Sequence, residues 1–247
     1  MQNFKINTGE AIISLHTIKQ FAFECSQGKH KEKNQQLFEQ AVKYMPITEL
    51  DMGINYRARI ISPDDTENTG IIRENGIPIS GYNTEHSGVA PIKNITKNGR
   101  VNRIGEQVLY LAEDIQTTCK EQKANANDYI SVAECTIKEK IRVMDFTISV
   151  SDEHNKLFSD ETIKFFKDNH SINIIAFYIF IKEYLTSPNY ATQEYLVPLS
   201  FLDIAKKRND ISGIKYNSFY TTGHNIALWD DNKHLKCTNS KVVQAKT

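Results

Sequence analysis

Hydrophobic residues near the N-terminus recur every three or four positions, the spacing that places them on one face of an α-helix. One such stretch lies at residues 12–22 and a second at residues 37–45, with a polar segment around Gly28 between them. A helical hairpin of this size buries too little apolar surface to fold alone. We therefore expect residues 1–48 to form an N-terminal helical segment that packs onto a domain formed by residues 49–247.

The hydrophobic period changes to two over residues 54–60, where apolar residues alternate with Asn55, Arg57 and Arg59. This alternation predicts a half-buried strand whose polar face carries two arginines. Residues 63–100 are rich in Gly, Asn, Ser and Pro and show little periodicity, so they predict a long loop. Long loops inside compact domains often serve as lids or binding loops.

The remaining chain mixes strands and helices without a regular strand–helix–strand alternation, which favours an α+β fold. Apolar alternation predicts strands over residues 108–112, 129–137, 141–148, 211–216, 225–229 and 235–243. Helical spacing predicts helices from a cap at Glu113 or Asp114 to about residue 124, over residues 159–184 with a break near 169, and over residues 193–207.

Composition is that of a globular protein, with 40% hydrophobic and 24% charged residues among 247. Thirty basic residues balance thirty acidic ones, so nothing in the charge points to nucleic acid or an anionic membrane as the main partner. Lys5 and Glu10 interrupt what would be the apolar core of a signal peptide, and the apolar run 172–181 is too short to span a bilayer. These features predict a cytoplasmic protein.

Neither metal chemistry nor a known phosphate-binding loop is supported by motifs. The seven histidines form no HExxH pair, and no P-loop, dinucleotide-binding GxGxxG or nucleophile-elbow sequence is present. We therefore expect no metal. The cysteines at positions 25, 119, 135 and 237 are far apart and form no CxxC pair, which argues against a zinc ribbon or a dense disulfide framework. They are expected to be reduced.

Three sequence blocks carry the most specific pattern in the chain. They are YRARI at residues 56–60, GRVNRIGEQVLYLAED at 99–114, and GIKYNSFYTTGHNIALW at 213–229. With Glu121 after the second block and Ser218 inside the third, the chain resembles the RES-domain family over about residues 49–232. The family is named for its arginine, glutamate and serine, and its best-known members are bacterial toxins that consume NAD+.

The resemblance implies an ADP-ribosyltransferase-like fold, with a twisted β-core, surrounding helices and NAD+ bound as substrate in a central cleft. Breaking the bond between nicotinamide and ribose passes through an oxocarbenium-like transition state, as in glycoside hydrolysis. Such a site needs cations for the pyrophosphate, a carboxylate facing the ribose, and a wall that orients the nicotinamide.

The resemblance assigns the catalytic roles to Arg57, Glu121 and Ser218. Arg57 would bind the pyrophosphate, Glu121 would hold the ribose hydroxyls and stabilise the developing cation, and Ser218 would position Glu121 or a phosphate. Periodicity alone favours solvated positions for Arg57 and Glu121, so these roles depend on the resemblance. Glu113 and Glu134 are the alternative carboxylates.

Six further residues are assigned to substrate binding by their places in the same blocks: Tyr56, Arg59, Arg100, Asn102, Tyr110 and Asn225. Arg100 would bind phosphate or brace its loop. Tyr110 would stack on the nicotinamide or bond to the ribose, although a tyrosine in an apolar strand is more often a core residue, and Tyr56 has the same two interpretations. Asn225 would hold the closing loop.

The chain departs from the family pattern at two places. Arg103 stands where the family often has proline after Asn102, and Gln122-Lys123 replaces a hydrophobic residue, arginine and proline after Glu121. Three functions are therefore weighed. The first is an NAD+ glycohydrolase or phosphorylase, acting as a toxin or phage-defence effector. The second is an ADP-ribosyltransferase that modifies a protein, and the third a catalytically silent binding module.

The resemblance also implies partners. NAD+ is the expected substrate, and toxins of this family usually act beside a separately encoded antitoxin or immunity protein. Residues 1–48 contain no DNA-binding helix-turn-helix, so direct nucleic-acid binding is not expected. Those residues would dock on the core, cover the cleft or mediate assembly into a homo-oligomer.

Overall fold

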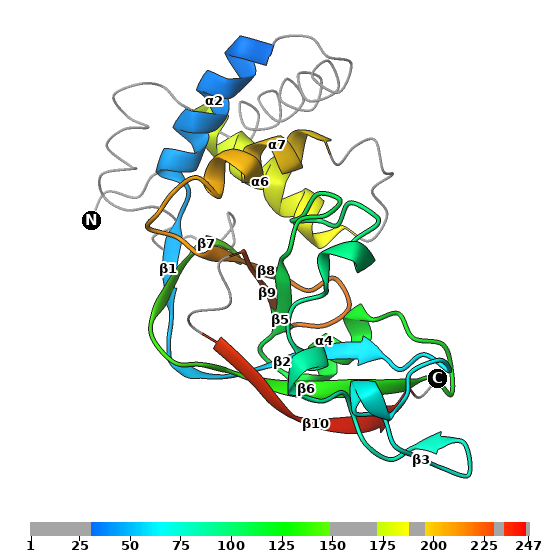
Figure 1. Ribbon diagram of the computed structural model, residues 1–247. Helices are drawn as coiled ribbons and strands as arrows, with labels where there is room; N and C mark the ends of the chain where they lie inside the picture. The colour runs from blue at the N-terminus through cyan, green and yellow to red at the C-terminus, as the bar shows by residue number, and fades with distance from the viewer. Residues whose placement is uncertain (1–30, 149–171, 188–195, 230–234, 246–247) are drawn as a thin grey trace.

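The computed structural model describes residues 31–148, 172–187, 196–229 and 235–245 of the chain (Figure 1). Its helices are α2 (Lys31–Tyr44), α3 (Thr84–Ser87), α4 (Ile115–Glu121), α6 (Ile172–Thr186) and α7 (Leu196–Ala205), with 3-10 turns η1 (Glu67–Thr69) and η2 (Ile92–Asn94). Its strands are β1 (Ile47–Leu50), β2 (Gly53–Ile60), β3 (Arg73–Glu74), β4 (Ile77–Pro78), β5 (Leu109–Ala112), β6 (Tyr129–Ile137), β7 (Ile141–Phe146), β8 (Gly213–Asn217), β9 (His224–Leu228) and β10 (Leu235–Gln244).

One eight-stranded sheet organises the described residues, in the order β1-β7-β8-β9-β5-β2-β6-β10. β7 and β8 run parallel, and the other neighbouring pairs are antiparallel. β2 meets β5 through one registered pair, Tyr56 with Ala112, whereas it pairs with β6 along its whole length. The two halves of the sheet therefore separate at the β5–β2 junction, as Figure 1 shows.

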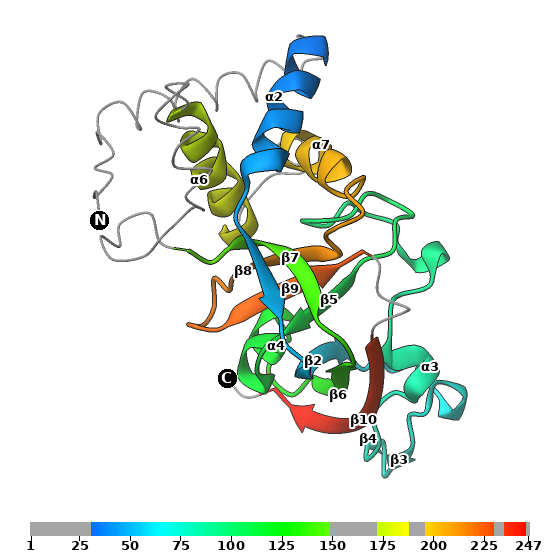
Figure 2. The ribbon, with the colours of Figure 1, turned by 90° about the vertical axis from the view of Figure 1, so that its left-hand side faces the viewer.

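Helices α2, α6 and α7 form a layer against the β7–β8 part of the sheet (Figures 1 and 2). The core between them is aromatic. The Phe201 ring lies 5.2 Å from that of Phe177, 6.4 Å from that of Phe146 and 6.5 Å from that of Phe38. Since Phe38 belongs to α2, this helix packs onto the domain as expected from its apolar spacing. The division at residues 48/49 stays a prediction, and the helix expected at residues 12–22 lies outside the described residues.

Helix α4 packs against β2, β5, β6 and β9, away from the three-helix layer. Asp114 is its N-cap: one carboxylate oxygen accepts from the Thr117 amide at 2.7 Å. The cap was expected at Glu113 or Asp114, and the structure selects Asp114. Its last residue is Glu121, so the short helix carries this carboxylate toward the β5–β2 junction.

The predicted α+β class is confirmed, and every predicted strand downstream of residue 100 is present within about two residues at each end. Residues 63–100 form a long connection that contains only short elements.

The inward apolar face predicted for β2 is wrong at its ends. Ile54 and Ile60 are 51% and 38% exposed while Asn55 is buried. β2 lies between β5 and β6 in the sheet, and its exposed residues are the two at its start and the one at its end.

No helix among the described residues is long and apolar enough to cross a membrane.

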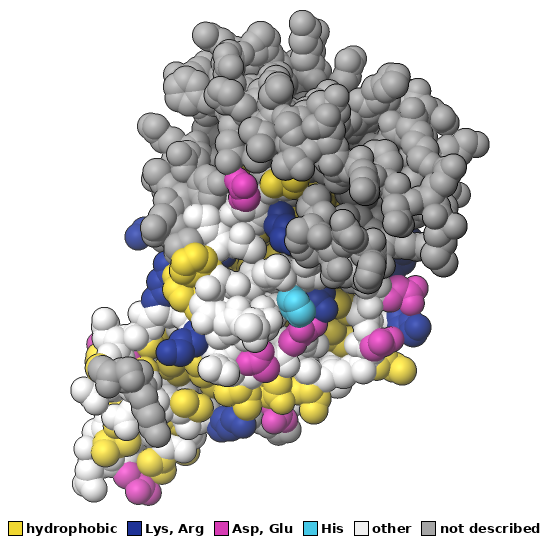
Figure 3. All heavy atoms as spheres, turned by 180° about the vertical axis from the view of Figure 1, so that it is seen from behind, with side chains coloured by type: hydrophobic (Ala, Val, Ile, Leu, Met, Phe, Trp, Pro, Cys, Tyr) yellow, Lys and Arg dark blue, Asp and Glu magenta, His cyan; other side chains and the backbone are white. Residues whose placement is uncertain are grey.

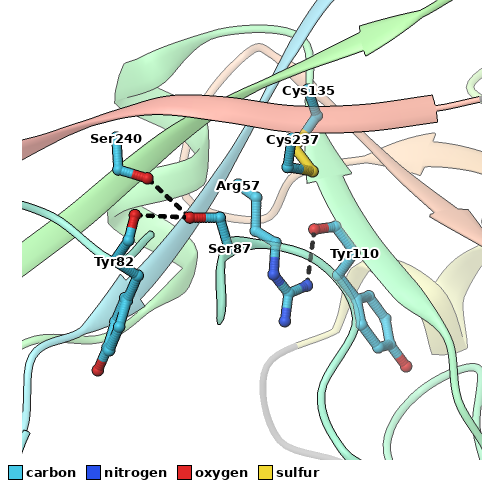
Figure 4. The surroundings of a disulfide bond; sticks show 7 residues. All are labelled: Arg57, Tyr82, Ser87, Tyr110, Cys135, Cys237 and Ser240. Carbon is cyan, nitrogen blue, oxygen red and sulfur yellow. Dashed lines mark hydrogen bonds between the residues drawn. A yellow bond between two sulfur atoms is a disulfide. The ribbon is translucent and has the colours of Figure 1, made fainter. Parts of the chain in front are cut away.

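The prediction that all cysteines are reduced is wrong for two of them. Cys135 on β6 and Cys237 on β10 are directly paired across the strands and form a disulfide that links positions 102 residues apart (Figure 4). Cys119 is a free thiol, and Cys25 lies outside the described residues. Sequence spacing could not find this pair because strand register alone brings the two residues together.

The disulfide gives the first prediction. Cys237→Ser should lower the free energy of unfolding by about 2–5 kcal/mol, because the bond closes a long loop in the unfolded chain. Urea unfolding without reductant measures the loss, and Cys119→Ser is the matched control. With dithiothreitol present, wild type and Cys237→Ser should unfold alike. A thiol titration of denatured, unreduced protein that finds all four cysteines reactive would contradict the bond.

Candidate active site

A cavity of about 420 Å³ opens at the β5–β2 junction. It is lined by residues of β2, β5, α4, β8 and β9 and by the loop before β5: Arg57, Ala58, Arg59, Gly99, Arg100, Tyr110, Leu111, Thr118, Glu121, Gln122, Lys123, Tyr216 and Asn225. The separation of the two half-sheets makes this space, and α4 closes one side of it.

The lining is strongly basic. Arg57, Arg59, Arg100 and Lys123 contribute four positive charges, and Glu121 contributes the one carboxylate among the lining residues. The chain as a whole has a formal charge of zero, so this local excess is a property of the cavity. A cleft lined mainly by one sign of charge concentrates ligands of the opposite sign. The cavity is therefore suited to an anion.

Glu121 is held by two side chains, one just after β8 and one on β9. Ser218 donates its hydroxyl to Glu121 Oε1 at 2.7 Å, and Asn225 Nδ2 donates to the same oxygen at 2.7 Å. The Tyr220 amide donates to Ser218 Oγ at 3.1 Å, which orients the hydroxyl toward the carboxylate. Both side chains bond to Oε1, so they fix the orientation of the carboxylate, and neither of these two bonds uses Oε2.

The two arginines of β2 are oriented by backbone carbonyls. Arg57 Nη1 donates to the Tyr110 carbonyl at 3.3 Å (Figure 4). Arg59 Nη1 donates to the His86 carbonyl at 2.5 Å, and its guanidinium lies 4.6 Å from the centre of the Tyr82 ring. Burial and a hydrogen bond to a carboxylate raise the pKa of Tyr82 to about 12, so this ring stays neutral beside Arg59.

The loop at residues 99–102 is built around one phenol. Tyr110 accepts from the Val101 amide at 3.0 Å and donates to Asn102 Oδ1 at 2.8 Å. Burial raises the pKa of Tyr110 and keeps it protonated, which this donor role requires. A Cβ on Gly99 would lie 2.3 Å from Asn102 Oδ1, so the close approach of loop and side chain requires glycine.

Most of the predicted site residues meet at this cavity. Arg57, Arg59, Arg100, Tyr110, Glu121 and Asn225 line it, and Ser218 reaches it through Glu121.

Besides Ser218, which meets the cavity only through Glu121, two predicted residues do not line it. Asn102 is buried within the loop and accepts from the Tyr110 hydroxyl, and Tyr56 packs with Ala58 and Ile130 in a separate apolar cluster. The Tyr110 hydroxyl is used by its own loop, which argues against the expected bond from it to a ribose. Asn225 bonds to Glu121, and the role expected for it in holding a closing loop stays a prediction.

Several lining residues were not predicted: Ala58, Leu111, Thr118, Gln122, Lys123 and Tyr216. Tyr216 could have been found, because it lies two residues before Ser218 on a strand and so shares its face. Lys123 could not. It follows α4 in a left-handed backbone conformation with φ of 50°, which helical spacing does not anticipate.

The two alternative carboxylates, Glu113 and Glu134, are not among the lining residues. Glu113 accepts from Lys215 Nζ at 2.5 Å and from His224 Nδ1 at 2.7 Å. Partial burial alone would raise the pKa of Glu113, but these two bonds outweigh it and lower the pKa below its usual value. Of the three candidate carboxylates, Glu121 is the one at the cavity.

No group of three or more His, Cys, Asp or Glu placed to hold a metal is found within the described ranges. On the described part of the face in Figure 3, basic and acidic side chains are interspersed and form no continuous basic stripe.

Comparison with known proteins covers two of the three blocks from which the site was predicted and leaves residues 56–60 outside the matched range. The family profile described as the RES domain matches residues 79–245. A search of curated protein sequences finds no match. Among solved structures, the chain is similar to the crystal structure of the M. tuberculosis MbcT–MbcA toxin–antitoxin complex. The match has 11% identity and a TM-score of 0.46, and it covers 85% of this chain and 92% of that one.

The phenol of Tyr110 gives a second prediction. Tyr110→Phe should cost about 2–3 kcal/mol of unfolding free energy, because it leaves a buried amide and a buried amide oxygen without their partner. Tyr178→Phe is the matched control. Its hydroxyl makes a bond to the Ile148 carbonyl at 3.0 Å in the helical layer, and its loss should cost about 1 kcal/mol. Urea unfolding measures both, and an equal loss in the two variants would contradict the proposed role of the phenol.

Glu113 gives a third prediction, on pH. Its folded-state pKa lies below the unfolded value, so its stabilisation is present above the unfolded pKa, about 4.3, and is lost as pH falls through the folded pKa. The stability difference between wild type and Glu113→Gln should therefore be larger at about pH 6 than at about pH 3. Urea unfolding at both pH values tests this, and a difference independent of pH would count against the pairing.

Proposed function

Because the chain belongs to the RES domain family, we propose that it is an enzyme that consumes NAD+ by cleaving the bond between nicotinamide and ribose. The observation that carries the proposal is a carboxylate, Glu121, fixed by Ser218 and Asn225 inside a cavity otherwise lined by cations. This arrangement combines an anion-binding surface with a group suited to a cationic transition state.

The cations supply the binding step. NAD+ carries a pyrophosphate with two negative charges, and guanidinium groups bind phosphate oxygens through charge-assisted hydrogen bonds. Arg57 and Arg59 come from one strand and Arg100 from the loop opposite, so the phosphates would be held from two sides. The cavity volume of about 420 Å³ falls within the range of small-molecule sites.

Glu121 supplies the chemical step. As the bond from C1′ of the ribose to the nicotinamide nitrogen breaks, its electron pair moves to the ring nitrogen and positive charge develops on the sugar. The Glu121 carboxylate stabilises that charge, with Oε2 toward the ribose and Oε1 held by Ser218 and Asn225. Water then attacks C1′ and releases a proton, giving ADP-ribose and nicotinamide. Phosphate as acceptor gives ADP-ribose 1″-phosphate instead.

The physiological role proposed is that of a toxin or phage-defence effector, held in check by a separately encoded antitoxin or immunity protein. NAD+ depletion arrests cells, so induction of the wild-type chain in a bacterial host should stop growth while Glu121→Gln should not. Growth arrest by both would contradict a role through NAD+ consumption.

The central test uses isosteric substitution. Glu121→Gln keeps an oxygen for Ser218 and Asn225 but removes the negative charge, so NAD+ should bind within about threefold of wild type while nicotinamide release falls by about 10²–10³. Arg57→Met should mainly weaken binding. Glu113→Gln, a carboxylate outside the cavity lining, is the matched control and should turn over NAD+ at the wild-type rate.

Nicotinamide release followed by chromatography, with and without phosphate, measures all four proteins. The second product names the acceptor, and labelled ADP-ribose found on a polypeptide would establish the protein-modifying alternative. Binding without turnover in wild type, unchanged by Glu121→Gln, would establish a silent binding module. Equal turnover by wild type and Glu121→Gln would overturn the role given to this carboxylate.

A further inference from the structure

Helix α7 is bonded to the loop that carries Arg100 into the cavity. Lys206, just after α7, donates from Nζ to the Val101 carbonyl at 2.7 Å and to Glu106 Oε1 at 2.6 Å. Its side chain is only 11% exposed. A lysine this buried is costly unless it is paired, and both partners lie on the loop.

A second pair joins the same two elements. Arg103 on the loop bonds to Asp203 of α7 through Nε at 2.9 Å and Nη2 at 2.6 Å, a two-point contact to the carboxylate. The Arg103 amide donates to Glu106 Oε2 at 2.8 Å, which links this pair to the one made by Lys206. Asp203 and Lys206 are three residues apart, so they face the loop from one side of the helix end.

Helix α6 holds the loop at Arg100 itself. Tyr184 donates its hydroxyl to the Arg100 carbonyl at 3.1 Å, and Arg100 donates in turn to the Leu185 carbonyl. The backbone on both sides of the Arg100 side chain is therefore fixed by the helical layer, by α6 at residue 100 and by the end of α7 at residues 101–106. We call Arg103, Glu106, Asp203 and Lys206 the α7 clamp.

We propose that the α7 clamp is a set of positioning residues that holds Arg100 and Gly99 at the cavity and thereby sets the affinity for the pyrophosphate of the substrate. The inference rests on the proposed function for the identity of the substrate. A guanidinium that binds phosphate in a defined geometry loses affinity when its backbone becomes free to move. Part of the binding free energy must then be used to order the loop. The chemistry at Glu121 depends on other elements and should be little affected.

The test compares two cations at the end of one helix. Lys206 bonds to the Val101 carbonyl and Glu106, whereas Arg208 bonds to the Val42 carbonyl and Asp210. Lys206→Met and Arg208→Met each remove a cation, a carbonyl bond and an ion pair, but only Lys206 contacts the loop. Lys206→Met should raise KM for NAD+ about tenfold with kcat within about twofold, and Arg208→Met should leave both unchanged.

Arg103 provides a variant that should fold, because its side chain is 38% exposed. Arg103→Ala should raise KM about threefold and Asp203→Ala similarly, with no further rise when the two are combined. The exchange Arg103→Asp with Asp203→Arg should recover part of the affinity. Independent effects in the double variant, or unchanged KM in every clamp variant, would overturn the inference.

Binding of inorganic pyrophosphate, measured by calorimetry without NAD+, separates this inference from the proposed function. Weaker pyrophosphate binding by Lys206→Met than by Arg208→Met supports the clamp even if wild type releases no nicotinamide, a result that would refute the proposed function alone. Equal pyrophosphate affinity in the two variants, or none in wild type, overturns the clamp whether or not NAD+ is consumed.

Discussion

The carboxylate of Glu121 is the point on which the site depends. It ends α4, and its Oε1 joins that helix to Ser218 after β8 and to Asn225 on β9. A carboxylate drawn into a cavity has to be satisfied by donors, so these two bonds constrain the helix and both strands together. Asp114 sets the other end of α4, where Thr117 also contacts Thr221 at 2.7 Å in the connection between the same two strands. The helix is thus fixed at both ends against one connection.

The second constraint is the incomplete pairing of β2 with β5 in the sheet. β2 follows β6 closely but meets β5 at one position, Tyr56 with Ala112. A fully paired junction would bring the two strands within hydrogen-bonding distance along their length and leave no space between them. The opening instead admits the side chains of Arg57 and Arg59 from one side and the loop before β5 from the other. The cavity is therefore a consequence of incomplete strand pairing.

The strands and several residues of the site could be predicted from the sequence, but the contacts between segments far apart in the chain could not. Alternating apolar residues located the strands. The order of the blocks predicted Arg57, Glu121 and Ser218 as site residues, and the first two line the cavity while Ser218 bonds to Glu121. Local patterns report the period of an element and say nothing about which strands become neighbours. The Cys135–Cys237 disulfide depends on strand register, and the use of the Tyr110 hydroxyl depends on a loop that folds back over it. Both were missed for the same reason.

The two departures from the family pattern fall where this structure provides another restraint. Proline would limit the backbone after Asn102. Arg103 stands there instead, with its amide bonded to Glu106 and its side chain to Asp203. After Glu121, Lys123 turns the chain with a positive φ, lines the cavity, and lies 5.6 Å from the centre of the Tyr220 ring. Neither change removes a cation from the cavity or a partner from Glu121. Both positions still supply charge to the site: Arg103 pairs with Asp203 beside the loop that carries Arg100, and Lys123 is one of the four cations that line the cavity.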